Sequence, residues 1–116
     1  MIRLKTGFST LLISLLMSSV LWASDPVWID VRSSEEYAAG HVELAVNIPY
    51  TEIGSHIGEV TQDKDALIYV YCRSGRRAGI AMDTLNEMGY MNVVNLESLE
   101  NAQAQACEKD QRIACN

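Results

Sequence analysis

The sequence predicts a single α/β domain built around a parallel β-sheet. Short apolar runs with β-branched residues alternate along the chain with segments of helical spacing, which is the order expected of strands joined by helices. Several of these runs are apolar throughout, as strands are when both faces of their sheet are covered. The chain has 116 residues, enough for one small domain. We therefore expect one sheet with helices on both faces.

The first 23 residues lie outside this pattern and have the order of a secretory signal peptide. Arg3 and Lys5 precede an apolar run, and small residues follow near Ala23. A membrane anchor is the alternative, because residues 7–23 approach the length of a short spanning helix. Serine and threonine dilute this run, however, and no basic cluster follows it. We expect cleavage after Ala23, export to the periplasm, and one domain over residues 24–116 that no longer contacts the membrane.

The charge of the exported domain limits its partners. Cleavage removes two basic and no acidic side chains, so the net charge changes from −6 to −8. Such a domain repels nucleic acid and anionic lipid over most of its surface. The only concentrated positive charge is that of Arg73, Arg76 and Arg77. We expect a monomer that binds a small anion near these arginines and does not bind nucleic acid.

The first half of the chain predicts two strands around one helix. Residues 27–31 are apolar and β-branched, which indicates a buried strand. Ser33 or Ser34 can then cap a short helix, and Gly40 ends it. A second, shorter strand follows at residues 45–48 and is closed by proline.

The second half repeats the alternation around the strongest strand, residues 66–71, which ends directly at Cys72. Helical spacing begins at Arg76, and Gly89 provides a C-terminal stop. The remaining expected elements are a short helix within residues 50–57, a strand at 90–96, a short helix at 98–105 and an irregular polar tail to Asn116.

Cys72 is the candidate nucleophile. Ligands bind beyond the C-terminal ends of parallel strands, and Cys72 stands at such an end. Free amides and the dipole of the following helix, together with the nearby arginines, should lower the pKa of the thiol and favour the thiolate. Gly75 permits a turn that points backbone N–H groups inward, and Arg76 or Arg77 can hold an oxyanion by a bidentate contact. The alternative is a buried structural cysteine with exposed arginines.

Other polar residues favour structural roles. Asp30 and Arg32, at the end of the first strand, form a candidate ion pair that braces the site. His41 and His56 share no metal-ligand spacing and are expected at the surface or at a helix cap, so no metal site is predicted.

The three cysteines of the chain are Cys72, Cys107 and Cys115. Export implies an oxidising compartment in which cysteines tend to pair. Cys107 and Cys115 lie eight positions apart in the polar tail, so we expect them to pair and Cys72 to stay free. Connectivity cannot be read from sequence alone, and a pairing that includes Cys72 stays open.

Three segments of the chain resemble the rhodanese (thiosulfate sulfurtransferase) family in order and spacing. They are Asp30-Val31-Arg32 with Glu35 and Tyr37, Gly40-His41-Val42 running on to Ala45, Asn47, Ile48 and Pro49, and Tyr71-Cys72-Arg73-Ser74-Gly75-Arg76-Arg77-Ala78. With its signal sequence and single domain, the chain is similar to the small periplasmic rhodaneses of the phage-shock type. The resemblance implies a three-layer fold with a central parallel sheet of about five strands between helices. It implies no metal or organic cofactor.

The resemblance also implies a mechanism. Cys72 would attack the outer sulfur of thiosulfate, release sulfite and hold the sulfur as a persulfide, which cyanide or a thiol would then collect. Asp30 and Arg32 would support the site. The residues expected to bind the anionic donor are Arg73, Ser74, Gly75, Arg76 and Arg77.

Three alternatives stay open. Related phosphatases and arsenate reductases have five residues between cysteine and arginine, whereas four separate Cys72 from Arg77, which favours sulfur chemistry. A non-catalytic binding or sulfur-sensing module is the second alternative, and thiol redox exchange through Cys72 is the third.

The end of the chain departs from the pattern of the family that it resembles. Rhodanese domains commonly finish with a glycine- and tryptophan-bearing helix. This chain has Leu96 to Asn101 and a cysteine-bearing tail instead.

Overall fold

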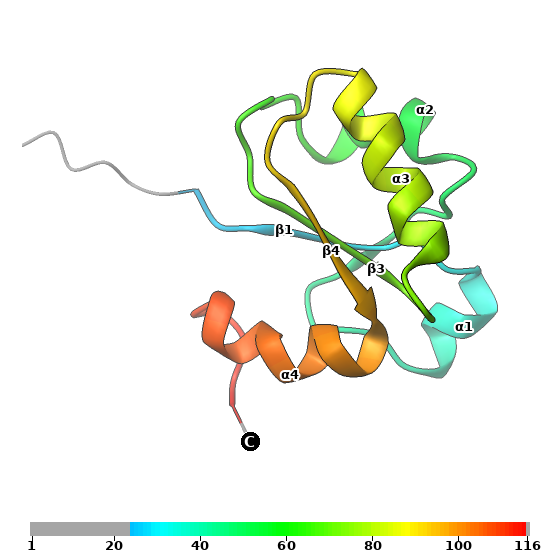
Figure 1. Cartoon of the computed structure of the whole chain (residues 1–116). Coiled ribbons are helices and arrows are strands. Elements are labelled where there is room, and N and C mark those ends of the chain that lie inside the picture. The colour runs from blue at the N-terminus through cyan, green and yellow to red at the C-terminus, as the bar shows by residue number, and fades with distance from the viewer. Residues whose placement is uncertain (1–23, 116) are drawn as a thin grey trace, which may run out of the picture.

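The computed structural model describes residues 24–115, and the predicted signal peptide over residues 1–23 lies outside the described residues. Strands and helices alternate along the chain, as predicted (Figure 1). The elements are β1 (Val27–Asp30), α1 (Ser34–Ala39), β2 (Val46–Asn47), α2 (Ile53–Val60), β3 (Ile68–Cys72), α3 (Arg76–Glu87), β4 (Val93–Ser98) and α4 (Leu99–Lys109).

The sheet is wholly parallel, which confirms the predicted α/β class. Its order is β2-β1-β3-β4, so the structure shows four strands within residues 24–115 where the resemblance implied about five. All five residues of β3 are buried, because β1 and β4 flank this strand and helices cover both of its faces. Four of its side chains are aliphatic or aromatic and the fifth is that of Cys72, so apolar and charged residues do not alternate along this strand.

Two apolar clusters pack on opposite faces of the sheet. In Figure 1, α2 and α3 lie on one face, and α4 lies on the other. The first cluster joins Ile53 and Ile57 of α2 to Leu85 of α3 against the sheet. The second joins Trp28 and Tyr69 to side chains of α4 and the tail. Burial of both clusters fixes the layers that carry the strand ends.

Local sequence signals account for several element ends. Ser33 caps α1 and forms a capping box with Glu36, and the N–H of Gly40 closes the helix on the carbonyl of Tyr37 at 3.1 Å. Gly89 has a φ of 96° just after α3, which favours glycine there. The last strand runs over residues 93–98 rather than the predicted 90–96, because the N–H of Tyr90 still bonds to the carbonyl of Leu85 at the end of α3, at 3.0 Å.

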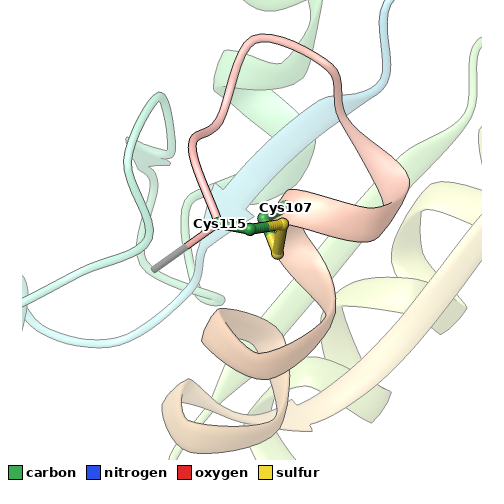
Figure 2. The surroundings of a disulfide bond; sticks show 2 residues. All are labelled: Cys107 and Cys115. Carbon is green, nitrogen blue, oxygen red and sulfur yellow. A yellow bond between two sulfur atoms is a disulfide. The ribbon is translucent and has the colours of Figure 1, made fainter.

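The tail is more ordered than the sequence predicted. Helix α4 continues to Lys109, and a disulfide joins Cys107 to Cys115, the pair that the sequence analysis selected (Figure 2). The buried carboxylate of Asp110 accepts a hydrogen bond from Nε1 of Trp28 at 2.9 Å. Arg112 in turn donates to the carbonyl of Pro26 at 2.9 Å. The tail is thereby fastened to the beginning of β1.

Within the described range, no helix combines the length and the apolar character needed to cross a membrane.

Candidate functional site

Cys72 is the last residue of β3 and is only 1% exposed. Beyond it, the chain makes a short turn and enters α3 at Arg76. In the sheet, Cys72 pairs with Ser98, the last residue of β4, after a shift of register that follows Val70. The thiol therefore lies at the carboxyl end of a central strand of the parallel sheet, which is where such sheets bind ligands.

Backbone amides surround the sulfur of Cys72. The N–H of Gly75 donates to Sγ at 3.0 Å, and the N–H of Ala78 donates at 3.4 Å. Gly75 has a φ of 96°, a left-handed conformation that a side chain would strain. The glycine predicted to form the turn is thus the residue whose own amide reaches the sulfur.

These amides decide the pKa of the thiol. Burial raises the pKa of Cys72, but hydrogen bonds from the backbone of Ala78, Ser74, Gly75 and Arg77 together lower it below its ordinary value. The predicted direction is confirmed. The amides are the main cause, and the charge of Arg77 also favours the thiolate, since the coulombic interaction with Cys72 raises the pKa of Arg77.

A second layer holds the turn in place. The side-chain amide of Asn95, on β4, donates to the carbonyl of Gly75 at 3.0 Å. The oxygen of the same side chain accepts the N–H of Glu97 at 2.8 Å. A Cβ atom added to Gly75 would lie only 3.2 Å from Cγ of Glu97, so the turn also packs closely against the end of β4.

Arg77 makes a bidentate ion pair, and its partner is Glu36. Nη1 and Nη2 of Arg77 lie 2.7 and 3.0 Å from the two carboxylate oxygens of Glu36. This guanidinium, with smaller contributions from Ser33, lowers the pKa of Glu36 to about 2. The sequence analysis expected a bound anion beside the arginines. At Arg77, the carboxylate of Glu36 occupies that place. The sequence analysis missed Glu36 as a site residue, since 41 positions separate it from Arg77.

Asp30 and Arg32 form the predicted pair. Asp30 is fully buried and accepts from Nη2 of Arg32 at 2.7 Å, from Nε at 3.0 Å and from the backbone N–H of Arg32 at 2.9 Å. Arg32 also donates to the carbonyl of Gly40 at 2.6 Å. These bonds fasten the end of β1 to the end of α1, and hydrogen bonding to Asp30 raises the pKa of Arg32.

A pocket of about 390 Å³ opens over the sulfur. Its lining residues are Arg32, Glu36, Cys72, Arg73, Ser98, Leu99, Glu100 and Gln103. Of the residues predicted to bind the donor, only Arg73 lines this pocket. Ser74 and Arg76 are exposed and do not line the pocket. Gly75 and Arg77 do not line it either, but each contacts a residue that does: Gly75 donates to the sulfur of Cys72, and Arg77 pairs with Glu36.

One wall of the pocket comes from the segment that departs from the family pattern. Ser98 ends β4, and Leu99, Glu100 and Gln103 belong to α4. Sequence reasoning did not select these residues. The adjacency of Cys72 and Ser98 follows from the strand order, and no local pattern reports that order.

The two histidines lie outside the pocket lining. Nδ1 of the exposed His41 lies 2.8 Å from the carbonyl of Tyr37, and that of His56 lies 3.4 Å from the carboxylate of Glu59. Over residues 24–115, no group of three or more His, Cys, Asp and Glu side chains is placed to hold a metal ion.

The arrangement suits nucleophilic attack by sulfur. A thiolate held by amide donors needs no general base, and the same amides can stabilise a second sulfur bound to it. Arg73 supplies an exposed cation at the pocket.

Comparisons with known proteins agree with this picture. The profile of the rhodanese-like domain matches residues 17–98. The chain is 40% identical over 91 residues to the thiosulfate sulfurtransferase PspE of Escherichia coli, an alignment that covers 78% of this chain and 86% of PspE.

Two further similarities point the same way. The chain is 35% identical over 68 residues to YrkF of Bacillus subtilis, a putative sulfur carrier protein; the alignment covers 59% of this chain and 36% of YrkF. The structure of an E. coli rhodanese with anions superposes with a TM-score of 0.63 and 42% identity, covering 66% of this chain and 89% of that one.

Proposed function

Because this chain belongs to the family of rhodanese-like domains, we propose that it is a thiosulfate sulfurtransferase that carries sulfur on Cys72. The observation that supports this most directly is the buried sulfur of Cys72 under converging backbone amides, with a pKa below its ordinary value. The likeness to PspE, a thiosulfate sulfurtransferase, indicates the donor.

The reaction takes place in two displacements. The Cys72 thiolate attacks the outer sulfur of thiosulfate, the S–S bond of the donor breaks, and sulfite leaves with the bonding electron pair. Cyanide or a thiolate then attacks the outer sulfur of the resulting persulfide, and the electron pair of the Cys72–sulfur bond returns to Cys72. Charge and atoms balance in both displacements without any external oxidant or reductant.

The donor is an anion, and the site is suited to one. Backbone N–H groups at the turn before α3 face the sulfur, and the helix dipole adds positive potential. Arg73 lies at the pocket and has no carboxylate partner among the described residues. Thiosulfate would bind with its sulfonate near Arg73 and its outer sulfur toward Cys72.

We also propose that the protein works in the periplasm as a monomer after cleavage of residues 1–23. The basic, apolar and small-residue order of this segment supports export. Cell fractionation followed by N-terminal sequencing tests it. A mature chain that begins at Ser24 in the periplasmic fraction is expected, and a full-length chain in the membrane fraction would instead favour an anchor.

The test of the activity is turnover. Mature protein mixed with thiosulfate and cyanide should release thiocyanate and sulfite in equal amounts. Cys72→Ser should abolish both products, and Cys107→Ser/Cys115→Ser should keep them. Wild-type protein that is folded but gives neither product with thiosulfate and any of several thiol or cyanide acceptors would refute the proposal.

A sulfur carrier without turnover is the second candidate, favoured by the similarity to YrkF. Such a module would form one persulfide per chain and pass it only to a specific protein partner. Stoichiometric loading of Cys72 that no small acceptor discharges would favour this alternative.

A further inference from the structure

We infer that Glu100 selects the acceptor in the second displacement, favouring small thiols that carry an ammonium group over thiols that carry an anionic group. This inference rests on the proposed sulfur transfer through Cys72. It assigns a role to the wall of the pocket built by the beginning of α4.

The structure fixes this wall beside the thiol. Ser98 of β4 is the strand partner of Cys72 of β3. The hydroxyl of Ser98 caps α4 by accepting the N–H of Asn101 at 3.0 Å, and the side chain of Asn101 donates back to the carbonyl of Leu96 at 2.8 Å. The first turn of α4, which carries Glu100, therefore begins directly from the strand that pairs with the nucleophile's strand.

Glu100 differs from the other acidic group of the pocket lining. Glu36 is neutralised by Arg77 at 2.7 Å, and the cation of Arg32 is neutralised by Asp30 at 2.7 Å. Within residues 24–115, Glu100 has no cationic partner within ion-pair distance, and Arg73 has no carboxylate partner. The lining thus holds one unpaired cation, on the turn after β3, and one unpaired carboxylate, on α4.

The two unpaired charges suit different reactants. The donor thiosulfate is a dianion, which Arg73 attracts and Glu100 repels. The persulfide that remains on Cys72 keeps the single negative charge of the thiolate, which now lies on the outer sulfur that the acceptor must approach. In the second displacement, the persulfide and Glu100 both attract a cationic aminothiol, and both repel an anionic thiol.

Gln103 adds a polar contact on the same side. It lies three positions after Glu100, so both side chains share one face of α4, and both line the pocket. An acceptor ammonium can donate to the carboxylate of Glu100 and to the side-chain oxygen of Gln103 while its thiolate approaches the outer sulfur. A bond then forms between the acceptor sulfur and that outer sulfur, the Cys72–sulfur bond breaks, and the electron pair returns to Cys72.

The test uses three two-carbon thiols whose second groups differ in charge, and each thiol is compared between protein variants so that its own size and acidity cancel. Cysteamine is cationic, 2-mercaptoethanol is neutral and 2-mercaptoethanesulfonate is anionic. The persulfide is loaded with thiosulfate, freed from excess donor, and discharged by each thiol at low salt. Wild-type protein is compared with Glu100→Gln. Glu108→Gln is the matched control, because Glu108 is exposed on the same helix and lies outside the pocket lining.

In Glu100→Gln, we expect the second-order rate constant to fall about threefold for cysteamine and to rise about threefold for the sulfonate, as for the loss of one charge interaction across a hydrated pocket. The neutral thiol should react nearly as before. Loading by thiosulfate should become faster. Added salt of about 0.5 M should shrink these differences. Glu108→Gln should behave as the wild type does.

If the ratio of the rate constants for cysteamine and for the sulfonate is the same in Glu100→Gln as in the wild type, the inference is overturned and the sulfurtransferase proposal stays intact. An equal slowing of all three acceptors would also overturn it, since that would indicate a structural role. Failure of thiosulfate to load wild-type Cys72 would overturn the proposed function, and the inference with it.

Discussion

At Cys72, burial and backbone hydrogen bonding act on the thiol in opposite directions. Burial alone would raise its pKa, but the amides after β3 donate to the sulfur and lower it. A buried thiolate is therefore obtained from the conformation of the turn, and Gly75 holds that conformation with a φ of 96°.

Gly75→Ala should raise the pKa of Cys72, because strain at a positive φ and contact with Glu97 would displace an amide donor. The pH dependence of iodoacetamide alkylation measures this. The rate falls as pH drops through the thiol pKa, so the midpoint should move to higher pH. Gly58→Ala is the control, since Gly58 has open space around its Cβ position. An unmoved midpoint in folded Gly75→Ala would contradict the role given to the amide.

Arg77 can act on the donor directly or through Glu36. Arg77→Ala leaves the carboxylate of Glu36 unpaired at the pocket, so persulfide formation from thiosulfate should slow about tenfold. Adding Glu36→Gln, which preserves the capping box, should restore most of the rate. A double variant as slow as the single one would show instead that Arg77 binds thiosulfate itself. Stopped-flow measurement of sulfite release distinguishes the two.

At the scale of elements, local chemistry made several predictions possible. Three features depend only on residues close in sequence: the helix that Ser33 caps and Gly40 ends, the buried strand that ends at Cys72, and the end of α3 near Gly89. The pairing of Glu36 with Arg77 and the wall formed by α4 depend on how distant elements are placed by the sheet. No periodicity reports such placement, so these features could not be predicted.

The stapled tail is an element whose stability can be tested. It holds Ile113 and Asp110 against the face of the sheet that contains Trp28. Cys107→Ser/Cys115→Ser should lower the free energy of unfolding by about 2–3 kcal/mol, the loss expected for opening a short loop. Urea denaturation measures this free energy. Wild-type protein with its disulfide reduced serves as a second comparison and should show a similar loss. No change in the urea midpoint would mean that packing alone holds the tail.

At the scale of the whole molecule, two carboxylates make the free energy of unfolding depend on pH. The pKa of Glu36 is lowered from 4.5 to about 2 chiefly by Arg77, and that of Asp110 is lowered from 3.8 to about 2 chiefly by Arg112. A lowered pKa in the folded state stabilises the fold above the unfolded pKa, and this stability is lost as pH falls toward 2.

Urea unfolding at several pH values should therefore show stability falling between about pH 4.5 and pH 2. Asp110→Asn should be less stable at neutral pH and should lose less stability on acidification. The exposed Asp63→Asn is the control. An identical pH dependence in Asp110→Asn and wild type would contradict the role of the Asp110 carboxylate.

The central claim is that Cys72 carries the transferred sulfur, and intact-mass spectrometry of the mature protein tests it most directly. Thiosulfate should add the mass of one sulfur atom, peptide mapping should place it on Cys72, and a thiol acceptor should remove it. An adduct that persists in Cys72→Ser, or no adduct at all on the folded wild type, would contradict the account.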